Sequence, residues 1–369
     1  MFTIKTPTKL MLSGEWAVLE ADNPCIVLAI DRYVWAKIKH SNEKIIINAE
    51  DINLKNIQAV FQKNKLLLKS KLSAKQLQKI SFVQNAIELT LQYLKYKKIF
   101  LKNFELFTSS KETLFSLPNG KTKKIGLGSS AAISVAVVSS ILKLHGFNIK
   151  LQKSKSLIFK IASTSHFISQ NNGSCFDIAA STFEKTIIYK RFDTKWLLSK
   201  IKNPKNICKI FEIDWPKLFI KKITLPPNFN LLVCWSTKSS NSKKMIFKIN
   251  QFKKEKERLY FDIILRIKKI TTQLIEAIKQ QDKTNILRLI QCNQEELETL
   301  GCASKTNIQT KELAKAIKIA QQNNALAKIS GSGGGDCAIA VCFNNNTTKK
   351  IKTEWEQAGL IPIDLNIIK

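Results

Sequence analysis

The sequence predicts an α+β protein of two domains, on three observations. Strand and helix patterns are mixed along the chain without a regular strand–helix alternation. The 369 residues exceed the roughly 100–200 residues of a typical domain. Prolines and charges interrupt the periodicity at 203–227, so we place a boundary there, between domains 1–205 and 206–369. The content of 44% apolar and 24% charged residues is that of a globular chain and excludes extended disorder.

Strand patterns and one clear helix open the chain. Apolar residues at helical spacing predict an amphipathic helix over Ala74–Tyr96. A polar loop, Ser109–Lys124, leads into a helix that is apolar nearly all round, so we expect it to be buried and to end at Gly146. Another helix follows over Lys153–Gln170. The predicted strands of this half are Thr3–Lys5, Leu10–Leu12, Cys25–His40, Lys44–Asn48, Phe104–Thr108 and Thr186–Tyr189.

The second half is predicted to be mainly helical. A strand, Asn230–Trp235, precedes a long helical region, Ser242–Gln281, and a shorter helix, Thr284–Leu300. A further helix has its apolar face between residues 313 and 320. It is followed by a glycine-rich loop, an apolar strand, and a final helix and strand.

Basic residues outnumber acidic residues by 60 to 28, which gives a formal net charge of +32. Most of the basic residues are lysines, and they interrupt almost every segment instead of gathering with arginine and aromatic residues in one stripe. We interpret them as a solvated surface that suits a small anionic substrate, and we predict no nucleic-acid partner. A nucleic-acid-binding module without enzymatic activity is the alternative that this charge leaves open.

The eight cysteines form no C-x-x-C pair and lie at no zinc spacing from the three histidines. We interpret them as small buried hydrophobic residues in a reducing compartment. The N-terminus lacks the apolar segment of a signal peptide, and the longest weakly polar run, Ala131–Leu142, is too short to span a bilayer. We therefore expect a cytoplasmic protein without a membrane partner.

Residues 126–132, GLGSSAA, open the buried helix and suggest phosphate binding. Glycines let the backbone approach an anion, and the first N–H groups of a helix are unpaired at the positive end of its dipole. The hydroxyls of Ser129 and Ser130 can cap the helix, bind a phosphate oxygen or ligate Mg²⁺. The pattern is neither a P-loop, because no lysine follows the second glycine, nor a dinucleotide fingerprint. A glycine turn with serine caps is the alternative.

A second glycine cluster, Ser330–Asp336, has the sequence SGSGGGD. Glycines are costly to order, so a dense cluster between a helix and an apolar strand indicates backbone that packs against something flat or anionic. A hairpin turn, which needs only one or two glycines, is the alternative.

Two charged residues have apolar sequence neighbours. Lys9 lies in an otherwise apolar strand segment, where a buried ammonium group would need a counter-charge. Asp177 lies between Phe176 and Ile178, so its carboxylate is expected to be partly buried, either as a helix N-terminal cap, the commoner outcome, or as a placed catalytic group. The alternative for Lys9 is a lysine on the solvent face of an edge strand.

Together these stretches resemble the three ordered motifs of the GHMP small-molecule kinases. The three stretches PTKLMLSGEWAVLE, IGLGSSAAISV and KISGSGGGDCAIAV occur in the order and spacing of that family over most of the chain. Within the superfamily, SGEWAVLE, QNNGSCFDIAAS and SGSGGGDCAIAV most resemble the phosphomevalonate kinase group. The resemblance is weakest at 61–102 and 199–281. Four residues depart from the family's pattern: Thr8 and Cys175 replace glycines, Trp16 replaces a tyrosine, and Thr122 replaces a proline.

The resemblance implies an N-terminal domain of the ribosomal-protein-S5-like type and a ferredoxin-like C-terminal domain, with ATP and the acceptor in the cleft between them. It implies transfer of a phosphoryl group from ATP to 5-phosphomevalonate, in the mevalonate route to isoprenoids, with Mg²⁺ as cofactor. The alternatives are a kinase that acts on mevalonate or another small molecule, a diphosphomevalonate decarboxylase, and a catalytically inactive relative. We expect a monomer or a homodimer.

By the same resemblance, Lys9 and Asp177 are the predicted catalytic residues, with Asp177 mainly holding Lys9. Ser130 is the predicted Mg²⁺ ligand, and His166 stands where related kinases have a second ligand, a glutamate. The loop Ser109–Lys124 is the expected wall of the adenine site. The predicted ATP- and phosphate-binding residues are Lys124, Gly126, Leu127, Gly128, Ser129, Ser130 and Ala131. The predicted acceptor-binding residues are Lys9, Arg32, Gly173, Ser174, Lys238, Ser332 and Gly333.

Overall fold

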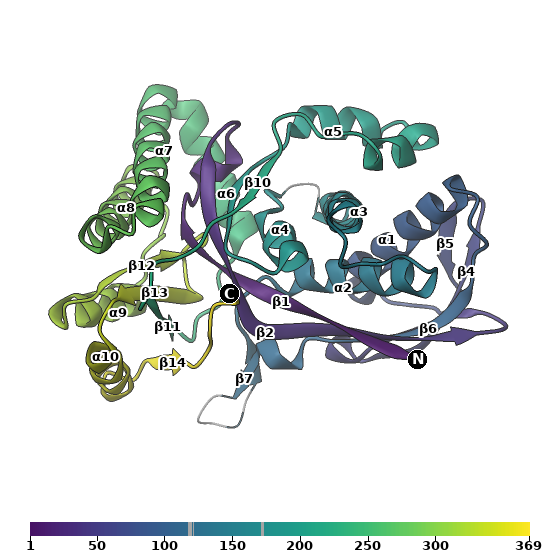
Figure 1. Cartoon of the computed structure of the whole chain (residues 1–369), viewed down its shortest axis with the longest axis horizontal. Helices are drawn as coiled ribbons and strands as arrows, with labels where there is room; N and C mark the ends of the chain where they lie inside the picture. The colour runs from purple at the N-terminus through teal and green to yellow at the C-terminus, as the bar shows by residue number, and fades with distance from the viewer. Residues whose placement is uncertain (117–119, 121, 171–172) are drawn as a thin grey trace.

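The computed structural model describes residues 1–116, 120, 122–170 and 173–369. Within these ranges the chain forms one eight-stranded sheet, one four-stranded sheet and a two-stranded hairpin, each large sheet with its own helices (Figure 1). This mixture of sheets and helices confirms the predicted α+β fold of two domains.

The first domain is built on the eight-stranded sheet, whose order is β10-β9-β2-β6-β3-β4-β5, with β1 paired to β2. Strands β1 and β2 are antiparallel over nearly their whole length, and Lys9 pairs with Ala29. The strands are β1 (Phe2–Ser13), β2 (Pro24–Ser41), β3 (Ile45–Ala49), β4 (Leu54–Gln62), β5 (Lys65–Leu68), β6 (Asn103–Ser109), β9 (Ile187–Lys190) and β10 (Phe219–Lys222).

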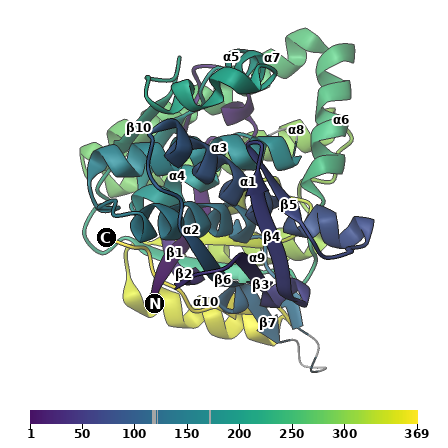
Figure 2. The same cartoon turned by 90° about the vertical axis from the view of Figure 1, so that its right-hand side faces the viewer.

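Four helices pack on one face of this sheet and share its core: α1 (Ala74–Tyr96), α2 (Ser129–Leu144), α3 (Gln152–Gln170) and α4 (Phe176–Phe183). They lie together above the sheet in Figure 1, and α1, α2 and α3 are seen again from the side in Figure 2. The central helix α2 is buried over most of its length because it is apolar nearly all round. Its N-terminus and that of α4 both lie near Lys9 of β1.

The second domain has the four-stranded sheet, in the order β12-β13-β11-β14. One face of this sheet packs on helices of its own domain, and the other shares a core with β1 and β2, so the domain interface is apolar. The elements are β11 (Asn230–Trp235), α6 (Ser242–Glu255), α7 (Glu257–Lys279), α8 (Lys283–Ala303), α9 (Lys311–Gln322), β12 (Leu326–Ser330), β13 (Cys337–Cys342), α10 (Asn345–Gln357) and β14 (Ile361–Ile363).

Several local predictions were wrong. The strands predicted at Thr3–Lys5 and Leu10–Leu12 are one strand, β1, because the register shift at Pro7/Thr8 is absorbed in β2 without interrupting β1. The single helical region Ser242–Gln281 is two helices, because Lys256 has a non-helical backbone (φ −136°, ψ 58°). The elements that sequence analysis did not assign include β4, β5, β10, β12 and the helices α4 and α5 (Thr194–Ile201).

The predicted loop Ser109–Lys124 contains a hairpin of β7 (Leu114–Ser116) and β8 (Thr122–Lys124). Residues 117–119 and 121 of this predicted adenine wall, and Asn171 and Asn172 of the QNNGSC stretch, lie outside the described residues. The change of sheet falls between β10 and β11, and the proposed boundary at residue 205 stays a prediction.

All eight cysteines are free. Five are buried, as predicted, but Cys302 is exposed and two others are only partly buried. The expectation of small buried hydrophobic residues was therefore wrong for Cys302, which follows a glycine near the end of α8. Of the helices in the described ranges, none combines the length and the apolar character that a membrane span requires.

Candidate active site

The turn at residues 126–128 presents the N-terminus of α2. Gly128 is the N-cap and has a left-handed backbone (φ 81°), a conformation that glycine adopts without strain. In the part of the chain that the structure describes, the amides of Ser129, Ser130 and Ala131 donate to no acceptor, whereas the next amide, of Ala132, bonds to the Gly128 carbonyl. Three free amides at the positive end of a buried helix form a site for an anion.

Lys9 of β1 lies directly against this turn. Its Nζ donates to the Gly126 carbonyl at 3.3 Å, and its backbone N–H donates to the Leu127 carbonyl at 3.0 Å. The side chain is 8% exposed, and its ammonium group lies 5.5 Å from the centre of the Phe176 ring. Lys9 is therefore a buried cation and not a lysine on the solvent face of an edge strand.

The surroundings of Gly128 show that the two catalytic candidates, Lys9 and Asp177, lie close to each other. A Cβ atom at Gly128 would lie 2.9 Å from Lys9 Cε and 3.5 Å from Asp177 Cβ. Lys9 and Asp177 therefore flank the same glycine, from β1 and from the first turn of α4. Among the described residues they form no ion pair; Asp177 Oδ1 accepts the backbone N–H of Ile178 at 3.0 Å. The expected lysine–aspartate couple is therefore a close approach of two side chains that no ion pair joins among the described residues.

Asp336 brings the second glycine cluster to the first. Its Oδ1 accepts the Gly126 N–H at 3.2 Å, and its backbone N–H donates to the Lys238 carbonyl at 2.7 Å. Burial raises the pKa of Asp336, and the Lys9 charge and the Gly126 amide partly offset this effect. Sequence analysis quoted Asp336 in its motif but did not include it among the site residues. The available signal was an acidic residue that directly follows a run of glycines.

The glycines of the second cluster allow close packing of protein backbone. Gly333, Gly334 and Gly335 all have positive φ angles (73°, 72° and 140°). A Cβ atom at Gly335 would lie 2.6 Å from the Lys238 carbonyl oxygen, and one at Gly333 would overlap the backbone of Ile308. These glycines therefore allow the loop to pack between the segments that contain Ile308 and Lys238. In this position the Asp336 carboxylate accepts the hydrogen bond from Gly126.

A methyl group at Gly126 is expected to destabilise the protein. The Cβ atom of Gly126→Ala would overlap the Asp336 carboxylate, so we expect the free energy of unfolding to fall by ~1–3 kcal/mol, as for other overpacked sites. Urea unfolding measures this change. The control is the same substitution in an Asp336→Ala background, where the methyl group has room and is expected to cost little. An equal loss in both backgrounds would contradict the contact.

Several predicted acceptor-binding residues are engaged elsewhere. Arg32 donates to the Asp364 carbonyl and lies over the Phe115 ring, 5.5 Å from its centre. Ser332 shares hydrogen bonds of 3.0 Å with Ser240 and with Ser242. Both side chains therefore already have protein partners, and their predicted role in acceptor binding stays a prediction.

Three other predicted residues have neighbours within the first domain. Ser174 is buried, and its carbonyl accepts the Tyr189 hydroxyl at 2.6 Å. Gly173 has φ 150°, and a Cβ atom there would lie 3.9 Å from His166 Nδ1. Lys124 donates to Ser110 Oγ at 3.3 Å, and burial lowers the pKa of Lys124.

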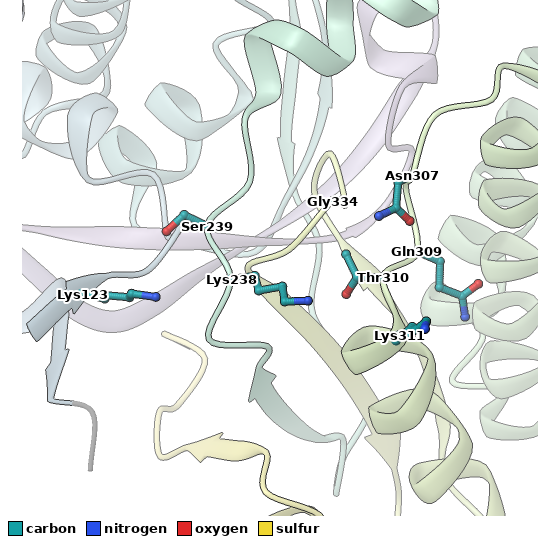
Figure 3. A pocket seen from close by; sticks show the side chains of 8 residues that line it. All are labelled: Lys123, Lys238, Ser239, Asn307, Gln309, Thr310, Lys311 and Gly334. Carbon is teal, nitrogen blue, oxygen red and sulfur yellow. The ribbon is translucent and has the colours of Figure 1, made fainter. Parts of the chain in front are cut away.

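A cavity of about 840 Å³ lies beside the second glycine cluster (Figure 3). Lys123 and Lys238 approach it from one side and Lys311 from the other, so its lining is positive. Lys238 forms a 2.6 Å ion pair with Glu312, which lowers the pKa of Glu312 to about 2. The cavity therefore suits an anion, although one of its lysines is partly neutralised.

The residues around Ser130 limit which metal could bind. Ser130 Oγ lies 3.4 Å from His166 Nε2, and burial lowers the pKa of His166, which favours the neutral ring. Within the described ranges, no group of three or more His, Cys, Asp or Glu side chains could hold a metal ion. Mg²⁺ commonly uses one or two protein ligands and completes its shell with water and phosphate oxygens. The Ser130 hydroxyl therefore fits a Mg²⁺ ion that a nucleotide carries.

Comparison with known protein families identifies the class of protein to which this chain belongs. Residues 81–185 match the GHMP kinases N terminal domain, and residues 274–360 match the GHMP kinases C terminal domain. The chain belongs to the GHMP kinases, a family of phosphotransferases.

Relatives that are named for an enzymatic activity match nearly the whole chain. It is 23% identical to the phosphomevalonate kinase of Streptomyces sp. (strain CL190), over 97% of this chain and 95% of that protein. It is 26% identical to the mevalonate kinase of Pyrococcus furiosus, over 97% and 93%. It superposes with a TM-score of 0.83 on Streptococcus pneumoniae phosphomevalonate kinase in complex with phosphomevalonate and AMPPNP, with 26% identity and all of both chains covered.

Proposed function

We propose that this protein transfers the terminal phosphoryl group of ATP to 5-phosphomevalonate, which yields 5-diphosphomevalonate and ADP. The observation that carries the proposal is the convergence of Lys9, Asp177 and the N-terminus of α2 around Gly128. It is supported by the full-length likeness to phosphomevalonate kinases, one of them in complex with phosphomevalonate and AMPPNP. We place the protein in the cytoplasm.

Phosphoryl transfer depends on alignment and charge neutralisation more than on covalent chemistry by the protein. In the proposed mechanism the amides of residues 129–131 bind phosphate oxygens of ATP. Lys9 stabilises the negative charge on the phosphoryl group as it passes to the acceptor. A phosphate oxygen of 5-phosphomevalonate forms the new P–O bond while the bond to the ADP oxygen breaks. Mg²⁺, held by Ser130 and the nucleotide, would supply further charge neutralisation.

Asp177 is proposed to position Lys9 and to have at most a small role as a base. A phosphate monoester has a second pKa of about 6, so at neutral pH the acceptor is mostly a dianion and needs little deprotonation. We expect Asp177→Asn to lower kcat clearly while the pH dependence still follows ionisation of the acceptor, measured as kcat/KM from pH 5 to 8. A kcat within about threefold of the parent protein would remove Asp177 from the mechanism.

The acceptor is tested by ADP release with each candidate substrate. We expect rapid ADP release with 5-phosphomevalonate and release with mevalonate near background. Preference for mevalonate would identify the chain as the sister kinase, an alternative supported by the mevalonate kinase relatives. Tight, steeply salt-dependent binding to random duplex DNA without ATP turnover would instead support a nucleic-acid-binding module that uses the +32 charge.

A further inference from the structure

A second cavity, of about 460 Å³, opens in the first domain between β1, α2, α3 and α4. This volume lies in the range of about 300–1,000 Å³ that is typical of small-molecule sites. On α2 the lining begins at Val135, whereas the proposed phosphate site lies at Ser129, and six residues of α-helix span about 9 Å. None of Lys9, Ser129 and Asp177 lines the cavity, so its lining differs from that of the proposed active site.

The cavity has an apolar floor and a positive rim. The apolar lining comes from Ile4, Val135, Phe147, Ile149 and Ile158. The four lysines of the lining, Lys5, Lys143, Lys150 and Lys155, face one acidic residue, Glu184. Lys155 pairs with Glu184 at 3.0 Å, and in the described part of the chain the other three lysines form no ion pair. The cavity therefore carries an excess of positive charge beside apolar surface.

Two unsatisfied polar features complete the lining. The Thr182 side chain is 4% exposed, and its Oγ1 has no hydrogen-bond partner within the described residues. Among the described strands β1 pairs only with β2, so Thr3–Thr6 present the backbone groups of a free strand edge at the cavity. A buried hydroxyl without a partner is uncommon and indicates that a ligand or water completes its hydrogen bonds.

We propose that this cavity binds a small organic anion that carries a short apolar chain. The anionic group lies among Lys5, Lys143 and Lys150, and the chain lies on the apolar floor. Thr182 Oγ1 and the free edge of β1 supply the directional hydrogen bonds. Neither an apolar molecule nor a bare anion uses the whole lining, because each leaves one of the two surfaces unmatched.

The experiment compares three probes on the full chain by isothermal titration calorimetry: n-hexyl phosphate, n-hexanol and inorganic phosphate. We expect n-hexyl phosphate to bind at least tenfold more tightly than either of the others. Three equal, weak affinities would overturn the proposal. The titration needs no turnover, so its result does not depend on the acceptor that the enzyme uses.

Charge reversal locates the binding. Lys143→Glu combined with Lys150→Glu is expected to weaken n-hexyl phosphate binding at least tenfold, and Thr182→Val to weaken it severalfold. Both lysines are exposed, so the double variant should fold, and a thermal melt checks this. Lys153→Glu is the matched control, because Lys153 is an exposed lysine at the start of α3 outside the lining. Binding that the double variant leaves unchanged would place the probe elsewhere and overturn the proposal.

Discussion

Replacing Lys9 by methionine is expected to lower kcat at least ~100-fold, with the KM values for both substrates changed only a few-fold. Lys9 is a buried cation that contacts the Gly126 carbonyl, and Asp177 and Asp336 lie near it. A fixed charge in such a water-poor place stabilises the charge of a transferring phosphoryl group more strongly than one in solvent. Methionine keeps most of the side-chain volume and removes only the charge. Steady-state ADP release measures both constants.

Lys55→Met is the matched control, because Lys55 is an exposed lysine on β4 of the same sheet. It undergoes the same chemical change and is expected to keep the parental kcat. A Lys9→Met variant with a raised KM and an unchanged kcat would contradict the proposal. That result would mean that Lys9 binds the ground state and the transition state equally.

For two elements, local periodicity was enough to predict the bounds that the structure shows. The predicted helix Ala74–Tyr96 and the predicted strand Asn230–Trp235 agree with α1 and β11 at both ends. In α1 the helix start is also fixed locally, by a capping box between Ser73 and Gln76. By contrast, β4 has exposed polar residues at Lys55, Asn56, Gln58 and Gln62 but also the exposed Val60, which obscured the alternation of apolar residues. Strand β5 has only four residues, and its three leucines in a row show no alternation.

Partners distant in the chain could not be predicted from such local patterns. The spacing of Gly126 and Gly128 indicated a close approach by something anionic, but their nearest neighbours include side chains of the protein itself, Asp336 and Lys9. Gly126 and Asp336 are 210 residues apart, so only the packing of the two domains brings them together. Likewise, no local pattern indicated that the Asp364 carbonyl, in the C-terminal segment, would accept a hydrogen bond from Arg32.

A buried ion pair that sequence analysis missed joins the two domains. Glu15 lies two residues after the end of β1, and Lys328 lies in the apolar strand β12; both side chains are fully buried and in contact. Lys328 also donates to the Ile329 carbonyl at 2.5 Å, and the Gly331 N–H donates to Glu15 Oε1 at 3.5 Å. Burial lowers the pKa of Lys328. The signal in the sequence was the one used for Lys9, a lysine within an apolar strand.

Lys328→Met is expected to lower the free energy of unfolding by ~3–5 kcal/mol, because it leaves the Glu15 carboxylate buried without its cation. Glu15→Met is expected to have a similar effect through the unpaired ammonium group. Urea unfolding measures both. The control is Lys279→Met, which breaks the exposed pair of Lys279 and Glu276 and is expected to cost at most ~1 kcal/mol.

The double variant separates the pair's net contribution from the cost of an orphaned charge. When both partners become methionine, no charge remains buried, so we expect most of the lost stability to return. Restored stability with reduced kcat would mean that the pair's main role is to hold Glu15 against Gly331 at the start of the second glycine cluster. Single variants whose free energy of unfolding falls by less than ~1 kcal/mol would contradict this account, because a buried charge without a partner is strongly destabilising.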